Sequence, residues 1–210
     1  MLQTATIHPT TLGILKKIME SSDLKQFNLV GGTALALQIG HRISIDLDLF
    51  TFNDYDSTSV IRIMESIGHL EIIMDKPPFL QLRIDDLKID FLKFPYAFVQ
   101  DYVELDSVRL VSIENIAIMK LLAVARRGVK KDFFDLYFLL QQYSLEDILK
   151  FFTLKIPNVD LFHIIKSLTY FDDAESDANP KMIKKATWGQ VKKKIVKETQ
   201  AYLISRPNIS

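Results

Sequence analysis

Residues 43–50, ISIDLDLF, alternate between apolar and polar side chains and predict a half-buried β-strand. Residues two apart in a strand lie roughly 6.6 Å from each other on one face, so Ser44, Asp46 and Asp48 are expected to share a face. Neighbouring carboxylates repel, and both ionise easily only if a cation lies between them. A pair of magnesium ions would supply such cations. The same pattern is also typical of a solvent-facing strand edge.

A third carboxylate lies in a second apolar segment. Residues 87–94, LKIDFLKF, predict another strand, in which Asp90 stands between Ile89 and Phe91. An unpaired buried charge is costly, so an acid in these surroundings is expected to have a partner. Asp90 therefore favours a functional site over a polar strand edge.

Two glycines lie upstream of these acids. Residues 27–32, FNLVGG, predict a short buried strand, and residues 33–40, TALALQIG, predict a helix that ends at Gly40. Gly31-Gly32 lets the backbone approach a ligand closely, and the N-terminus of the next helix offers N–H groups to a phosphate. The same dipeptide often marks only a tight turn. No GK[ST] follows it, which excludes a Walker A loop.

The remaining pattern divides the chain in two. Residues 1–111 combine helices and strands, and the pattern from Ser112 to residue 210 is helical, so we expect two domains with this boundary. Trp188 and the cluster at Phe171 are expected to fasten the last helix. Other predicted helices are 10–19 (capped by Thr10 or Thr11), 57–67, 113–127, 131–142, 145–153, 159–169 and 188–203, and other strands are 70–74 and 79–84.

Composition excludes several classes of protein. The chain has 210 residues and no cysteine, which rules out disulfides, thiol catalysis and cysteine-based zinc sites and agrees with a cytoplasmic location. No signal peptide and no apolar stretch of roughly 18 residues is present, so no membrane association is expected. Lys+Arg and Asp+Glu both number 26, and this zero net charge gives no argument for nucleic-acid binding.

The helical half contains charged residues in apolar surroundings. The neighbours of Lys120 three and four residues away are all apolar, so its side chain projects from the core-facing stripe. Such a lysine either snorkels to the edge or binds an anion, which could be a carboxylate or a triphosphate. Asp135 lies in a helix that is apolar nearly all round, one turn after Asp132. An ion pair of Asp135 with Lys120 or Arg126 is the simplest structural interpretation.

Together these segments resemble a known family. A strand ending in GG[ST], a helix, DxD on the next strand and a lone Asp on a later one are similar to the polymerase-beta-like nucleotidyltransferases. GGTALAL with GHRISIDLDLF, and IENIAIMKLLAVARRGVKKDFFDLYFLL at 113–140, resemble AbiEii-type nucleotidyltransferases, the toxins of type IV toxin–antitoxin and abortive-infection systems. The resemblance covers most of the chain. It implies an α/β (α+β) fold, with a mixed-sheet nucleotidyltransferase core followed by a helical C-terminal half.

The resemblance also implies a reaction and its residues. The enzyme would move a nucleoside monophosphate from an NTP to an acceptor hydroxyl and release diphosphate. Two Mg²⁺ ions would be bound by Asp46, Asp48 and Asp90, and Asp90 would help to deprotonate the attacking hydroxyl. Nucleotide phosphates would be held by Gly31, Gly32, Thr33, Ser44, Arg42 and Lys120, and Asp135, favoured over Asp132, would complete the site.

The acceptor implied by the resemblance is the 3′ end of a tRNA, and a separate antitoxin is expected. Two alternatives stay open: a catalytically silent module that binds nucleotide, RNA or a partner protein, and a transferase that modifies protein hydroxyls. Ser44 could instead order its loop, and Arg42 could cap the preceding helix.

Overall fold

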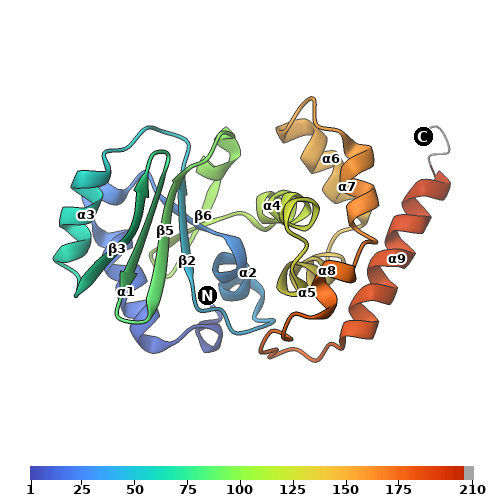
Figure 1. Cartoon of the computed structure of the whole chain (residues 1–210), viewed down its shortest axis with the longest axis horizontal. Helices are drawn as coiled ribbons and strands as arrows, with labels where there is room; N and C mark the ends of the chain where they lie inside the picture. Colours follow the sequence, from blue (N-terminus) through green and yellow to red (C-terminus); the bar gives the residue numbers. More distant parts are fainter. Residues whose placement is uncertain (206–210) are drawn as a thin grey trace. The chain divides into compact units, whose positions relative to one another are not determined.

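A computed structural model describes residues 1–205 (Figure 1). The chain divides into two compact units, Met1–Ile113 and the remainder from Glu114. The predicted boundary after residue 111 lies close to this division, and the assignment of two separate domains stays a prediction.

The first unit contains a mixed sheet. Its elements are η1 (Thr4–Thr6), α1 (Pro9–Glu20), η2 (Ser22–Leu24), β1 (Asn28–Val30), α2 (Gly31–Ile39), β2 (Leu47–Thr51), α3 (Ser57–Glu65), β3 (Leu70–Lys76), β4 (Phe79–Ile84), β5 (Leu87–Lys93), η3 (Ala97–Gln100), β6 (Tyr102–Leu105) and β7 (Val108–Val111). The strand order is β3-β4-β5-β2-β1-β7-β6. β2 runs parallel to β5 and antiparallel to β1, and β1 runs parallel to β7. Helix α2 packs against β1 and β2, and α1 against β7.

The centre of the sheet follows the predicted alternation. In β2 the side chains of Leu47 and Leu49 are buried, and Asp48 between them is half-buried. In β5 Leu87, Ile89 and Phe91 are buried and so is Asp90, which stands among them. The Phe91 ring packs edge-on against Phe27, with ring centroids 5.0 Å apart. The apolar side chains of both strands therefore belong to one core.

The strand predicted at 43–50 is wrong in its first four residues, which precede β2. Backbone groups of these residues form hydrogen bonds with residues outside the sheet. The Ser44 N–H donates to the carbonyl oxygen of Thr6 at 2.8 Å, and the Thr33 hydroxyl donates to the carbonyl oxygen of Asp46. A buried backbone group must find a partner, and here the partners lie outside the sheet. The alternation argument therefore does not apply to this half of the segment.

Two local features differ from the sequence predictions. The β6–β7 hairpin was not predicted, because its turn, Asp106-Ser107, lacks the Asn-Gly or Asp-Gly pair typical of such turns although both residues have positive φ. The first helix is capped by His8 and not by a threonine. Pro9 occupies its first position, and Nδ1 of His8 accepts a hydrogen bond from the Thr10 N–H at 3.3 Å.

The second unit is helical, with α4 (Ile113–Arg126), α5 (Lys130–Leu139), α6 (Leu145–Lys155), α7 (Leu161–Ser167), α8 (Asp172–Glu175) and α9 (Trp188–Ser205). Helix α9 packs against α5 and α6. The Trp188 ring stacks on Phe134, meets Phe133 and Phe171 edge-on, and donates a hydrogen bond to Glu175 at 3.0 Å. The prediction that Trp188 and the Phe171 cluster fasten the last helix is confirmed.

Within residues 1–205, no helix is both long enough and apolar enough to cross a bilayer.

The buried ring of Phe91 gives a test of the core. Phe91→Ala should lower the free energy of unfolding by about 3–5 kcal/mol, because it leaves a cavity in a packed interior. Phe52→Ala is the control: its side chain is 41% exposed, and the expected loss is below about 1 kcal/mol. Urea unfolding followed by circular dichroism measures both. Equal small losses would contradict the assigned core.

Candidate active site

Two acids meet across the parallel pair of strands β2 and β5. Asp48 is the Cα partner of Asp90 in this pair. Partner residues of parallel strands point to the same face of a sheet, and the strands lie roughly 4.8 Å apart. The two side chains therefore lie next to each other on one face. Asp48 is half-buried and Asp90 is 9% exposed.

Both carboxylate oxygens of Asp90 have partners. The Gln81 side-chain amide donates to Oδ1 at 2.9 Å, and Nζ of Lys88 lies 3.0 Å from Oδ2. Gln81 stands directly opposite Asp90 on β4, and Lys88 lies two residues earlier on β5. The expectation that an acid in this apolar strand has a partner is confirmed.

Asp46 lies before β2 in a half-buried position, yet its charge acts on the same region. Burial disfavours the charged ammonium of Lys88 and alone would lower its pKa. The hydrogen bond and charge of Asp90, with the charges of Asp46 and Asp48, outweigh this and raise the pKa of Lys88. All three carboxylates therefore lie near enough to Lys88 for their charges to act on its ammonium group.

Gly31 places the first turn of α2 directly against Asp48. Its φ of 70° lies in the left-handed region, and a Cβ added there would overlap Oδ2 of Asp48. Glycine meets both demands without strain. Gly31 and Gly32 open the helix, and the first N–H groups of a helix have no partners within it. The acid therefore lies beside amide groups suited to an anion.

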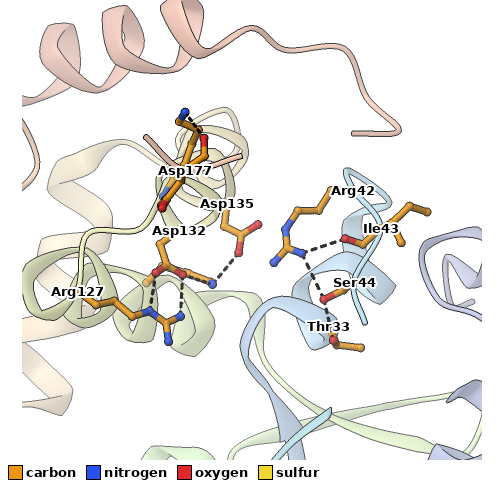
Figure 2. Close-up of polar contacts among 10 residues, drawn as sticks. Thr33, Arg42, Ile43, Ser44, Arg127, Asp132, Asp135 and Asp177 are labelled. Atoms are coloured by element: carbon orange, nitrogen blue, oxygen red, sulfur yellow. Dashed lines mark hydrogen bonds and ion pairs between the residues drawn. The ribbon is translucent and has the colours of Figure 1, made fainter. Parts of the chain in front are cut away.

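A buried polar cluster orders the segment that leads to Asp46 (Figure 2). The Thr33 hydroxyl lies 2.8 Å from Oγ of Ser44, and Nη1 of Arg42 donates to the carbonyl oxygen of Ile43 at 3.0 Å and to Oγ of Ser44 at 3.3 Å. Thr33, Arg42 and Ser44 are all buried. These contacts support the alternative in which Ser44 orders its loop. Phosphate binding by the three residues stays a prediction.

The donors of this region suit magnesium by their chemistry. Mg²⁺ prefers oxygen ligands, and carboxylates supply them. Within residues 1–205, however, no three His, Asp or Glu side chains are arranged as a group that could hold a metal ion. In this structure the ammonium group of Lys88 contacts Oδ2 of Asp90. The assignment of Asp46, Asp48 and Asp90 as ligands stays a prediction.

The helical unit contains a buried ionic cluster of its own (Figure 2). Nζ of Lys120 lies 2.8 Å from Oδ1 of Asp132 and 2.6 Å from Oδ2 of Asp135. The Arg127 guanidinium approaches Asp132 with two nitrogens, at 2.8 and 3.1 Å. Both carboxylates are fully buried. This cluster ties α4 to α5 and confirms the expected ion pair between Asp135 and Lys120.

The basic partners keep Asp132 ionised. Burial would raise the pKa of its carboxyl group, but the charge of Lys120 and the hydrogen bonds and charge of Arg127 lower it below the ordinary value of 3.8. An acid whose pKa is lower in the folded state stabilises the fold above its unfolded pKa. That contribution is lost as the pH falls through the folded value.

The sequence predictions missed two of these partners, Lys88 and Gln81. Lys88 shares a strand face with Asp90, so the i, i+2 rule could have identified it. Gln81 depends on strand register, which no local pattern fixes. Asp135 was favoured over Asp132, but Lys120 contacts both acids, so these contacts do not separate them.

Comparison with known proteins identifies the family of the chain. Residues 13–203 match the family described as nucleotidyl transferase AbiEii toxin, type IV TA system. The chain belongs to the AbiEii family. One relative, uncharacterized protein aq_aa25 of Aquifex aeolicus (strain VF5), is 31% identical over 195 residues, which cover 90% of this chain and 94% of the relative.

Solved structures share the fold of this AbiEii protein at low sequence identity. JHP933 from Helicobacter pylori has a TM-score of 0.60 at 18% identity and covers 93% of this chain and 90% of its own. MenT4, nucleotidyltransferase toxin Rv2826c from Mycobacterium tuberculosis H37Rv, has a TM-score of 0.53 at 14% identity, with coverages of 95% and 89%. The predicted fold is confirmed. By family, the protein is a nucleotidyltransferase of the toxin–antitoxin type, with an NTP substrate and an antitoxin partner.

The close approach of Gly31 to Asp48 gives a test. Gly31→Ala in this AbiEii protein should cost at least about 2 kcal/mol of unfolding free energy, because it adds backbone strain and an overlap. Gly13→Ala is the control, since an added Cβ there meets no atom within 4 Å in α1, and a gain of about 0.5–1 kcal/mol is expected. Thermal and urea unfolding compare them. A Gly31→Ala protein as stable as wild type would refute the contact.

The buried ionic cluster gives a second test. Lys120→Met should lower the unfolding free energy by about 3–5 kcal/mol, because two buried carboxylates lose a shared cation. Lys131→Met, at an exposed position of α5, should change it by less than about 0.5 kcal/mol. The measurement is urea unfolding at pH 7. Similar small losses in both variants would show that the cluster contributes little to stability.

Proposed function

We propose that this protein transfers a nucleoside monophosphate from an NTP to a hydroxyl at the 3′ end of a tRNA in a magnesium-dependent reaction. In this way it would act as the toxin of a type IV system in the cytoplasm. One observation carries the proposal: Asp48 and Asp90 are in register, and the first turn of α2 at Gly31 lies against Asp48. Carboxylates for cations and amides for phosphates are thus adjacent, as nucleotidyl transfer requires.

Each residue has a proposed part in the reaction. Asp46, Asp48 and Asp90 would hold two Mg²⁺ ions, which when bound supply positive charge for the triphosphate and the departing diphosphate. The backbone at Gly31 and Gly32 would bind phosphate oxygens. The acceptor oxygen bonds to the α-phosphorus, the bond from that phosphorus to the bridging oxygen breaks, and diphosphate leaves. Asp90 would receive the hydroxyl proton.

Other residues would support this site. Thr33 and Arg42 each form a hydrogen bond with Ser44, and the three residues would keep the approach to Asp46 in place and bind the phosphates. Lys120 would offset negative charge on the nucleotide, and Asp135 would orient it. These two parts of the proposal rest on the family, because both side chains are buried in their own ion pair.

Helix α9 contains lysines that bear on the proposed RNA acceptor. Lys192 and Lys194 are paired with Glu175 and Glu198, at 2.6 and 2.8 Å. Lys193 and Lys197 are exposed and could neutralise phosphates of an RNA backbone. The choice of tRNA therefore rests on the family more than on charge.

A transfer assay tests the reaction. The protein is incubated with each NTP labelled at the α-phosphate, Mg²⁺ and total tRNA, and labelled RNA is separated on gels. Asp48→Asn and Asp90→Asn should reduce transfer on the order of 10²-fold or more, because each removes charge from the transition-state site. Asp86→Asn is the matched control, since this exposed acid lies in the turn before β5.

The outcomes separate the alternatives. Label in protein and not in tRNA would refute the tRNA acceptor and favour modification of protein hydroxyls. No label in any fraction, with NTP binding retained in calorimetry, would identify a silent binding module. A large loss in Asp86→Asn equal to that in Asp48→Asn would remove the special role of the paired acids.

A further inference from the structure

Lys88 is placed on the carboxylate face by the strand that carries Asp90. The two residues are separated by one position in β5 and therefore share a face, with Nζ 3.0 Å from Oδ2. On the neighbouring strand β4, the Cα partner of Asp90 is Gln81, whose amide contacts Oδ1. The carboxylate is thus held on one oxygen by a neutral donor and on the other by a cation.

A second lysine of β5 provides a contrast. Lys93 lies 2.6 Å from Asp54, whose side chain is 92% exposed, whereas the Asp90 side chain is 12% exposed. The two lysine side chains have similar exposure, 42% for Lys88 and 36% for Lys93. Of the two lysines, Lys88 contacts the acid, Asp90, that is in register with Asp48. The difference lies in the surroundings of the acid and not in the lysine.

The surroundings of Lys88 are strongly negative. Its Nζ lies 3.0 Å from Oδ2 of Asp90, and the Cα partner of Asp90 on β2 is another acid, Asp48. Lys88 therefore neutralises part of the charge that Asp90 and Asp48 place on one face of the sheet. Without such a cation, neighbouring carboxylates would repel each other.

A divalent cation would compete with this ammonium. Both need the oxygens of Asp90, and two cations on one carboxylate repel each other at short range. Gln81 carries no charge and imposes no such conflict. The two oxygens of Asp90 therefore have different kinds of partner. A metal that binds Oδ2 has to displace Lys88, whereas Gln81 can stay on Oδ1.

We propose that Lys88 is a positioning residue that acts as an exchangeable counter-cation: it holds Oδ2 of Asp90 in the nucleotide-free protein and leaves it when a divalent cation binds. Gln81 keeps the carboxylate oriented during this exchange. Lys88 thereby sets the concentration of divalent cation at which the site fills. The inference rests on the proposed function, because it takes Asp90 as a metal ligand.

Binding of Mn²⁺ alone, without NTP, tests the inference, with free Mn²⁺ measured by electron paramagnetic resonance. Lys88→Met should bind Mn²⁺ about three- to tenfold more tightly than wild type, because the competing cation is absent. Lys88→Arg, which keeps the charge, should stay within about twofold of wild type. Lys93→Met should be unchanged. In the transfer assay, the Mg²⁺ concentration for half-maximal rate should fall in Lys88→Met.

The results distinguish this inference from the proposed function. If wild type and Lys88→Met bind Mn²⁺ equally, or if Lys88→Met binds it more weakly, the counter-cation role is wrong. The proposed metal site then still stands, provided that Asp48→Asn loses Mn²⁺ binding. If none of the proteins binds Mn²⁺ with or without NTP, the proposed site fails and the inference fails with it.

Discussion

The parallel pairing of β2 with β5 in a single register is the constraint on which the candidate site depends. Side chains alternate between the two faces of a strand, so a slip by one residue would send Asp90 to the face opposite Asp48. The buried pairs Leu47–Ile89 and Leu49–Phe91 prevent this slip, because it would move apolar side chains out of the core. Burial of four apolar residues thus fixes the distance between two charged ones.

The two units hold their charges in different ways. In the sheet, Asp90 keeps one partly exposed cation, which can move. In the helical unit, Lys120 and Arg127 each lie 2.8 Å from a carboxylate oxygen of Asp132, and Lys120 also pairs with Asp135. Desolvation makes such an enclosed cluster costly to break, and it fixes the arrangement of two helices. The partly exposed contact of Asp90 suits the exchange of one cation for another, whereas the buried cluster of the helical unit suits a fixed structural role.

Much of the fold could be predicted where one local rule decides the outcome. The apolar run around Asp90 identified β5, and the apolar neighbours of Lys120 identified its buried position. Prediction failed where a distant partner intervenes. Residues 43–46 have the alternation of a strand, but their groups bond to Thr6 and Thr33, which precede them by many residues. Gln81 reaches Asp90 only through the pairing of two strands, and no periodicity within β4 indicates this contact.

The two aspartates of the Asp-Leu-Asp motif are therefore held by unequal means. Asp48 is fixed by the hydrogen-bond ladder of a central strand, whereas Asp46 is positioned by side-chain hydroxyls and a short loop. Segments held by few contacts open locally at a lower free energy than the strands of a core. On warming, the enzyme would accordingly lose Asp46 from its place while the sheet is still folded. With Asp46 in its proposed role as a metal ligand, heat inactivation would then begin below the melting temperature of the protein and would be reversible on cooling.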